Sequence, residues 1–205
     1  MKVSAPPQPD EALIRAAQEG DRRAFHALVR RYETTVYRFA LKVCRDQAQA
    51  EESYQDTFIN VYRKLHTFDG KSKFSTWLYT IVTNNCLMKR RKRKRDELVE
   101  SLEALDEFPG EDGRGRTSRV ARWDVSPSDV MLERELREVL DRAIQKLPTP
   151  YRLVFVLRDM EEKSTEETAA ILKISVEAAK SRLRRARAFL RNELDPYLRD
   201  HRKAS

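Results

Sequence analysis

The amphipathic pattern of this chain is interrupted once, and the interruption limits what the chain can fold into. Eight acidic residues and no basic residue occupy positions 96–113, and a segment rich in Gly, Ser and Arg follows. An unstructured loop of this length is uncommon inside one compact domain, and its composition is typical of a flexible linker. The sequence therefore predicts two folded units, residues 10–95 and 131–200, joined by a flexible acidic linker over 96–130.

The first unit is expected to contain four helices, because apolar residues recur there at helical spacing and nowhere alternate with period two. Asp10 should cap a short helix that Gly20 ends, and Asp21 should cap the second. The third helix is expected over 47–65, with its buried stripe formed by Tyr54, Phe58, Val61, Tyr62 and Leu65. The fourth helix should begin at residue 74 or 75 and bury Phe74, Trp77, Leu78, Ile81, Val82 and Leu87.

The second unit ends in a pattern typical of a helix-turn-helix motif. Helices are expected over 129–146 and 150–159, and a capping box over 164–167 should start a short helix. A turn at 173–175 precedes a last helix, expected over 176–194 and capped by Ser175. One stripe of this helix is apolar (Val176, Ala179, Leu183, Ala186 and Leu190) and is expected to pack on the helix of Ala169 and Ile171. A second stripe is basic (Lys180, Arg184, Arg187 and Arg191), which favours major-groove binding over an ordinary solvated helix.

A second nucleic-acid signal lies at the end of the first unit. The fourth helix combines aromatic and small polar residues, and seven consecutive cations follow at 89–95. Single-stranded nucleic acid is held by such sets, because cations track phosphates and rings stack on bases. The alternatives are a core role for Phe74, Trp77 and Leu78, and a solvated tail or nuclear signal for the cations.

Composition excludes several classes of function. The net charge of +8 indicates an anionic partner. The chain contains no apolar run of membrane-spanning length, no secretory signal at its start and no phosphate-binding or hydrolase motif. The three histidines share no ligand spacing with Cys44 or Cys86, so no metal is expected. Because no catalytic motif is present, no cofactor and no enzymatic activity are expected either. The two cysteines are expected to be buried free thiols, and a redox bridge would require the second and fourth helices to bring them together.

Taken together, these segments resemble the extracytoplasmic-function (ECF) class of sigma factors, in the sigma-70 family of bacterial RNA polymerase. DEALIRAAQEGDRRAFHALVRRYETTVYRFA resembles the opening helices of the family. AEESYQDTFINVYRKLHTFDGKSKFSTWLYTIVTNNCLMKRRKR resembles the segment that binds the polymerase clamp and the minus-10 element. LPTPYRLVFVLRDMEEKSTEETAAILKISVEAAKSRLRRARAFLR resembles the helix-turn-helix that reads the minus-35 element. The resemblance implies an all-α fold with a four-helix sigma-2 domain (10–95) and a helix-turn-helix sigma-4 domain (131–200).

The resemblance also implies three sets of site residues. Binding of the clamp helices in the largest subunit of core polymerase falls on Gln55, Asp56, Phe58, Asn60 and Arg63. Minus-10 DNA is expected to contact the loop and the helix after it, through Phe68, Asp69, Gly70, Lys71, Ser72, Lys73, Trp77, Tyr79, Thr80, Thr83, Asn84, Lys89, Arg90 and Arg91. Minus-35 DNA is expected to contact Lys180, Ser181, Arg184, Arg185 and Arg187.

The function implied is that of an alternative sigma factor, which binds core RNA polymerase, recognises minus-35 and minus-10 elements and directs transcription initiation in the bacterial cytoplasm. Further partners implied are the flap of the second-largest subunit and an anti-sigma factor, which could hold the chain at the inner membrane without membrane insertion. A stand-alone helix-turn-helix regulator is the alternative, and an RNA-binding adaptor would leave the second unit unexplained. We also hypothesise that the acids of 96–113 fold back on the cations of 89–95 in the free protein.

Overall fold

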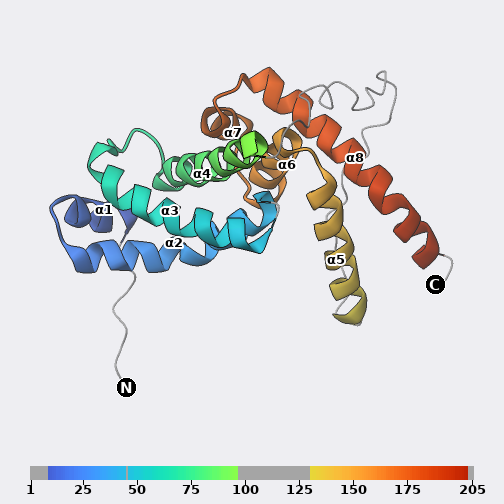
Figure 1. The fold of residues 1–205 in the computed structure, drawn as a ribbon, viewed down its shortest axis with the longest axis horizontal. Coiled ribbons are helices and arrows are strands. Elements are labelled where there is room, and N and C mark those ends of the chain that lie inside the picture. The colour runs from blue at the N-terminus through green and yellow to red at the C-terminus, as the bar shows by residue number, and fades with distance from the viewer. Residues whose placement is uncertain (1–8, 45, 97–129, 203–205) are drawn as a thin grey trace. The chain divides into compact units, whose positions relative to one another are not determined.

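The computed structural model describes the backbone of residues 9–44, 46–96 and 130–202, and the side chains of these residues except 90–96, 130–134, 198 and 200–202. Over this part of the chain the structure consists of helices and turns and contains no strand (Figure 1), which confirms the all-α prediction. Contacts between Cα atoms divide the chain into two compact units. Helices α1 to α4 fall in the first with α7, and α5, α6, η3 and α8 fall in the second. The acidic segment from residue 97 onward, and the hypothesis built on it, lie outside the described residues.

Helix α1 (Asp10–Gln18) begins at Asp10 itself, one residue earlier than it would if Asp10 were its N-cap. Its N-cap is Pro9, and Asp10 is its first helical residue. The prediction that Asp10 caps this helix is therefore wrong. The carboxylate instead binds helix α2, where Arg31 Nη1 donates to it over 2.5 Å and the hydroxyl of Tyr32 also donates. Burial, followed by this hydrogen bond, raises the pKa of Tyr32.

Helix α2 (Arg22–Val43) starts where the sequence predicts. Asp21 is its N-cap and accepts hydrogen bonds from the backbone amides of Arg23 and Ala24. Gly20 precedes the cap with φ of +99°, a left-handed conformation that a glycine adopts without a steric penalty. The buried side of α2 includes Val36, Phe39 and Ala40, which places this helix at the centre of the first unit.

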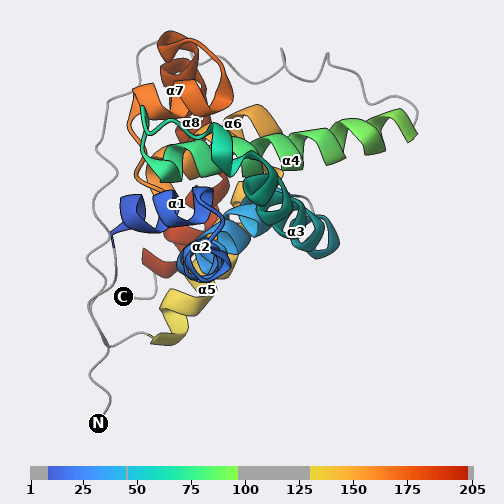
Figure 2. The same cartoon turned by 90° about the vertical axis from the view of Figure 1, so that its left-hand side faces the viewer.

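Helices α3 (Gln47–Lys64) and α4 (Phe74–Asp96) pack against each other and against α2, with the short helix η1 (Leu65–Thr67) between them in sequence. The side of α3 that enters the core is lined by small residues: Ala50, Ser53, Thr57 and Val61. Small side chains let two helices approach closely. Figure 2 shows the later part of α4 extending beyond α1, α2 and α3. The buried residues of α4 include Phe74, Leu78, Ile81 and Val82, as predicted, and also Tyr79 and Cys86.

The second unit is organised by α8 (Val176–Arg202), which packs on α6 (Thr149–Phe155) and α5 (Val130–Lys146). The apolar stripe of α8 was expected to pack on the helix of Ala169 and Ile171. Within the second unit it packs instead on α6, where Tyr151, Leu153 and Val154 are all buried. The five-residue helix η3 (Val156–Met160) has π geometry and continues α6, where the sequence predicted one helix over 150–159.

A buried arginine closes the junction between α5 and α6. Arg152 is 4% exposed, and its guanidinium donates to the carbonyl oxygen of Leu147 and to Oε1 of Gln145, the latter over 2.8 Å. The carbonyls at the end of a helix have no partner within the helix. Arg152 satisfies them and offsets the cost of burying its own charge. No local sequence pattern predicts this role of Arg152.

The predicted turn before α8 is present. Helix α7 (Thr165–Leu172) is followed by Lys173 in a left-handed conformation, with φ of 54°. The amide of Ile174 donates to the carbonyl of Ala169 over 3.0 Å, which closes the end of α7. Ser175 Oγ then accepts from the amide of Ala178, so the predicted cap is confirmed. Helix α8 continues past its expected end at residue 194 and includes Pro196.

Candidate functional site

The outer face of α3 carries two exposed apolar side chains among polar ones. Ile59 is 48% exposed and Tyr62 is 61% exposed. Gln55, four residues before Ile59, is also exposed, and Tyr62 follows Ile59 by three residues, so the three lie on one side of the helix. The sequence assigned Tyr62 to the buried stripe, which is wrong. Its ring instead lies edge-on to Phe25 at 5.1 Å, at the margin of the core.

The other positions implied for polymerase binding differ in their availability. Arg63 is exposed, and the ring of Phe58 is half-buried with its centroid 5.3 Å from that of Tyr54. Asn60 is also half-buried, and its amide donates to Oδ1 of Asn85 on α4 over 3.0 Å. Gln55 and Arg63 are therefore the exposed members of this set, and Asp56 has a partner described next.

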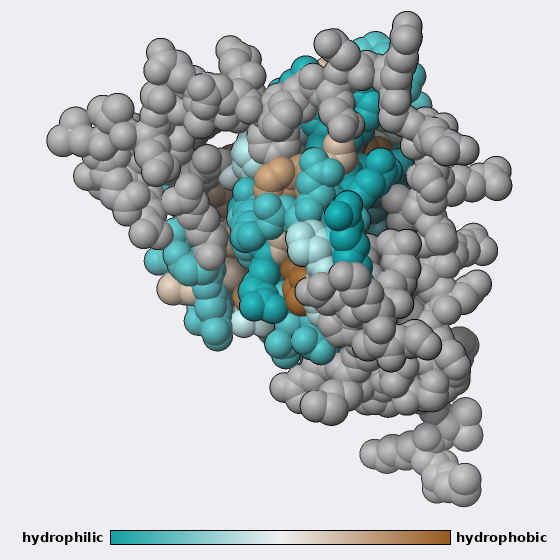
Figure 3. Space-filling model, turned by 90° about the vertical axis from the view of Figure 1, so that its right-hand side faces the viewer, coloured by the Kyte–Doolittle hydropathy of each residue, from teal (hydrophilic) through white to brown (hydrophobic). Residues whose placement is uncertain are grey.

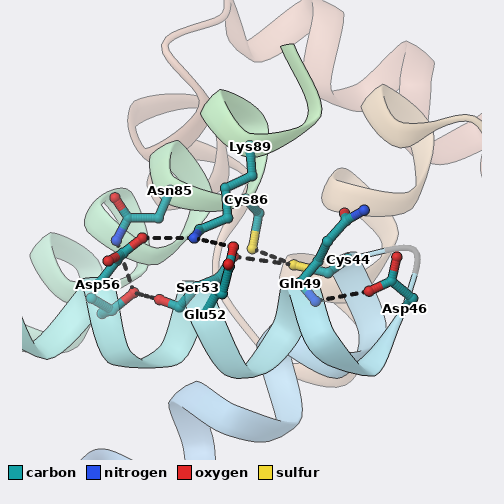
Figure 4. A network of polar contacts seen from close by, with 10 residues as sticks. Cys44, Asp46, Gln49, Glu52, Ser53, Asp56, Asn85, Cys86 and Lys89 are labelled. Carbon is teal, nitrogen blue, oxygen red and sulfur yellow. Dashed lines mark hydrogen bonds and ion pairs between the residues drawn. The ribbon is translucent and has the colours of Figure 1, made fainter. Parts of the chain in front are cut away.

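An ion cluster joins α3 to α4. Lys89 Nζ lies 2.6 Å from a carboxylate oxygen of Glu52 and 2.8 Å from one of Asp56 (Figure 4). Burial lowers the pKa of Lys89, and the hydrogen bonds to Asp56 and Glu52 outweigh that effect, so the net shift is upward. Lys89 therefore keeps its charge, with that charge directed at the α3 carboxylates. A residue implied for DNA binding and one implied for polymerase binding are thus paired with each other.

A buried chain of hydrogen bonds lies beside the ion cluster. Asn85 is 8% exposed and donates through Nδ2 to Thr57 Oγ1 over 3.1 Å. Thr57 in turn donates to the backbone carbonyl of Ser53 over 2.6 Å. This chain satisfies the polar groups that the close packing of α3 and α4 buries, and it sets the register of one helix on the other.

The positions on α4 implied for minus-10 DNA divide between two sides of the helix. Trp77, Thr80 and Asn84 follow each other at helical spacing and are half-buried or exposed. Tyr79 and Thr83 lie on the opposite side and are 5% and 1% exposed. Their side chains belong to the core in this structure, at odds with direct contact to DNA. The side chains of Arg90 and Arg91 are outside the described residues.

The loop before α4 is anchored on aromatic rings. The ring of Phe68 lies 5.6 Å from that of Phe74 and 5.4 Å from that of Trp77, between centroids. Gly70 follows with φ of +74°, which favours glycine. Asp69 accepts from the backbone amide of Lys71 over 3.1 Å and pairs with its ammonium over 2.8 Å. These hydrogen bonds lower the pKa of Asp69. The remaining loop residues, Ser72 and Lys73, are exposed.

A residue that the sequence analysis missed fixes this loop to α1. Gln18 Nε2 donates to the backbone carbonyls of Leu65 and Phe68, each over 2.9 Å. These two carbonyls belong to the first residue of η1 and to the residue that follows it, 47 and 50 positions from Gln18 in sequence. No local sequence pattern reports a contact over this separation. Gln18 is therefore a positioning residue for the loop.

The basic stripe of α8 is only partly available to a ligand. Arg187 forms a bidentate pair with Asp159 at the end of η3, at 2.8 and 2.6 Å. This pair raises the pKa of Arg187. Arg185 Nη1 lies 3.3 Å from the hydroxyl of Tyr151, and Lys180 pairs with Glu177 over 2.9 Å. Arg184 is exposed and pairs with no other side chain in the described part of the chain; Ser181 is half-buried.

Metal-binding clusters and membrane-spanning helices are both absent from the described residues. These residues contain no group of three or more side chains suited to hold a metal ion. Among the described helices, none combines the length and apolarity needed to cross a bilayer. On the face that Figure 3 presents, the described side chains are mostly hydrophilic, with small separate apolar patches.

Comparison with known proteins identifies the class to which this fold and these surfaces belong. Two sigma-70 family models match the chain: region 2 over residues 28–96 and region 4 over residues 137–190. The first match contains α3, the loop and α4, and the second contains α6, α7 and most of α8. The folded parts that carry the candidate site residues are therefore sigma-70 regions.

The relatives define the family more closely. The chain is 34% identical over 181 residues to the ECF RNA polymerase sigma factor SigW of Bacillus subtilis, covering 88% of this chain and 94% of that protein. It is 34% identical over 193 residues to the ECF RNA polymerase sigma-E factor of Escherichia coli, covering 93% and 96%. CnrH, solved in complex with the cytosolic domain of CnrY, is 28% identical with a TM-score of 0.61, covering 91% and 97%. The chain belongs to the ECF sigma factors and acts as an alternative sigma factor in transcription initiation.

Proposed function

We propose that residues 10–95 bind core polymerase and the minus-10 element, that residues 131–200 bind the minus-35 element, and that residues 96–130 link the two. This assignment gives each binding task to one amphipathic helical unit. Base contacts specify sequence and phosphate contacts position the protein. Two separate contact regions on one promoter would supply both kinds of contact.

The observation that carries the polymerase assignment is the outer face of α3. An apolar centre with a polar margin is typical of protein interfaces. Ile59 and Tyr62 supply the apolar centre, and Gln55 and Arg63 supply the polar margin. This face extends the set implied by the family resemblance, because Ile59 and Tyr62 were not in it.

For the minus-10 element, the proposed surface is the loop 68–73 together with Trp77, Thr80 and Asn84. Tyr79 and Thr83 are left out because they are buried. Flipping a base out of the DNA duplex costs a few kcal/mol, and stacking and hydrogen bonds to the edge of the base must offset that cost. The loop backbone, shaped by Gly70 and fixed by Gln18, is the part suited to that task.

For the minus-35 element, Arg184 is the proposed main base contact. One arginine paired with a guanine contributes about 1–3 kcal/mol of discrimination. Lys180, Arg185 and Arg187 have intramolecular partners, and their contribution to DNA binding requires those contacts to be exchanged. An anti-sigma protein is a further proposed partner, and the cytoplasm the proposed site of action. The support is that CnrH was solved with a cytosolic domain of CnrY.

The test of the polymerase assignment is a pair of exposed substitutions. Ile59→Ser should weaken binding of fluorescently labelled protein to purified core polymerase by roughly tenfold, since buried apolar side chains at an interface centre contribute about 1–2 kcal/mol. Thr34→Ala, at an exposed position of α2, is the matched control and should bind as the unmodified protein does. Equal affinity for both variants, with equal thermal stability, would reject the assignment.

A further inference from the structure

The two cysteines of this chain meet inside the first unit. Cys44 is the residue after the last turn of α2, and Cys86 lies in α4. Their sulfur atoms are 2.9 Å apart, although 42 residues separate them in sequence (Figure 4). Both are free thiols, 5% and 6% exposed. A disulfide needs about 2.0 Å between the sulfurs, so an approach of about 0.9 Å would bring them to bonding distance.

The surroundings make the two sulfurs unequal. The hydrogen bond from Cys86 favours the thiolate of Cys44, and contacts with Ser53 and Lys89 add to this effect against the opposing effect of burial. The pKa of Cys44 is consequently lowered. The pKa of Cys86 is raised by its hydrogen bond to Cys44 and by burial. A thiolate is the nucleophile in thiol oxidation, so Cys44 is the sulfur suited to attack first.

We propose that Cys44 and Cys86 form a reversible oxidation site, at which hydrogen peroxide converts the two thiols into an intramolecular disulfide. The Cys44 thiolate attacks one peroxide oxygen, the O–O bond breaks, and the hydroxide that leaves takes up a proton to give water. Cys44 is then a sulfenic acid. The Cys86 sulfur attacks the Cys44 sulfur, the S–O bond breaks, and the leaving hydroxide takes the Cys86 proton as a second water. Two thiols are oxidised, one peroxide is reduced to two waters, and a dithiol reductant reverses the reaction.

The disulfide would join the end of α2 to the middle of α4 and close a loop of chain that contains all of α3 and the residues 68–73 before α4. A cross-link over such a loop restricts the unfolded chain and stabilises the folded one. Both sulfurs are buried and need only a small approach, so the exposed sides of α3 and α4 keep their positions. The site thus stabilises the polymerase-binding unit under oxidising conditions and leaves its binding faces intact.

Mass spectrometry of the full chain tests the proposal directly. Peroxide treatment should lower the intact mass by about 2 Da, for two hydrogens lost. Digestion with trypsin should then yield one linked pair, residues 43–45 with residues 74–89, which dithiothreitol separates. A disulfide between two copies of the chain, seen as a dimer without reductant, would overturn the proposal. So would oxidation that stops at sulfenic or sulfinic acid on either cysteine.

Thermal unfolding and transcription test the consequence. Oxidation should raise the unfolding midpoint of the protein by about 8 °C or more, and should not raise it in Cys44→Ala or Cys86→Ala. Each protein is compared with its own reduced form, so that any destabilisation by the substitution cancels. Oxidised protein should direct run-off transcription with core polymerase at the rate of the reduced protein. An unchanged midpoint, or a loss of transcription that dithiothreitol restores, would contradict the stabilising role.

Discussion

Replacing Asn85 should destabilise the first unit far more than replacing its neighbour Asn84. Asn85→Ala removes the donor to Thr57 and the acceptor for Asn60, at 3.1 and 3.0 Å. Each hydrogen bond contributes about 0.5–1.5 kcal/mol net. The truncation also leaves a void, because Asn85 is 8% exposed and Thr57 is fully buried. A loss of about 2–3 kcal/mol in unfolding free energy is expected.

Asn84→Ala is the matched control for this experiment. Both residues lie inside α4, so the gain in helix propensity from asparagine to alanine, at most about 0.5 kcal/mol, is common to the two variants. The exposed Asn84 has no buried contact to lose, and its variant should unfold within about 0.5 kcal/mol of the unmodified protein. The difference between the variants therefore isolates the buried network.

Urea unfolding followed by Trp77 fluorescence reports on the first unit, provided that the second tryptophan is removed by Trp123→Phe in every protein compared. With a denaturant slope of about 1–3 kcal/mol per M, Asn85→Ala should lower the midpoint by roughly 1–2 M and Asn84→Ala by almost nothing. In promoter-opening assays the order should reverse, since Asn84 lies on the proposed minus-10 surface. Equal midpoints for the two variants would show that the buried hydrogen bonds of Asn85 do not stabilise the first unit.

Two further predictions concern positioning and base contact. Gln18→Ala should slow opening of the minus-10 region by two- to tenfold, because the loop loses two hydrogen bonds and about 1 kcal/mol of stabilisation. A fluorescent base in the promoter reports the opening rate. An unchanged rate would show that Gln18 does not position the loop. Arg184→Ala should weaken binding of a minus-35 duplex by about 1–3 kcal/mol, measured by fluorescence anisotropy. Asp159→Ala should strengthen the same binding, because Arg187 no longer pairs with Asp159 and can contact DNA. Weaker binding after Asp159→Ala would show that the pair itself orients the helix for DNA.

Local sequence signals predicted the helices well where a cap or a turn marks an end. Asp21 and Ser175 cap helices at the predicted residues, because an N-cap depends on a side chain and amides two or three positions away. Asp10 did not follow this rule. A partner on another helix, Arg31, competes for its carboxylate, and competition from distant residues is invisible in a local pattern.

The candidate site was harder to predict, because the positions on α4 that the family resemblance implies for DNA binding lie on both sides of that helix. Tyr79 and Thr83 are close in sequence to Trp77 and Thr80, yet the helical repeat turns the first two into the core. The periodicity of α3 also gave a wrong prediction, since its buried stripe is made of small residues and Tyr62, which was assigned to that stripe, is exposed. The meeting of Cys44 with Cys86 depends on how α2 crosses α4, which no spacing in one sequence specifies.

Core polymerase should become a promoter-specific enzyme when this chain binds it and contacts DNA at two elements. Run-off transcription from a pool of genomic promoters, with purified core polymerase and this protein, followed by sequencing of the start sites, measures this directly. We predict start sites that share one minus-10 and one minus-35 sequence at a fixed spacing, absent with core polymerase alone. Initiation no greater than that of core polymerase, or start sites with no shared upstream sequence, would contradict it.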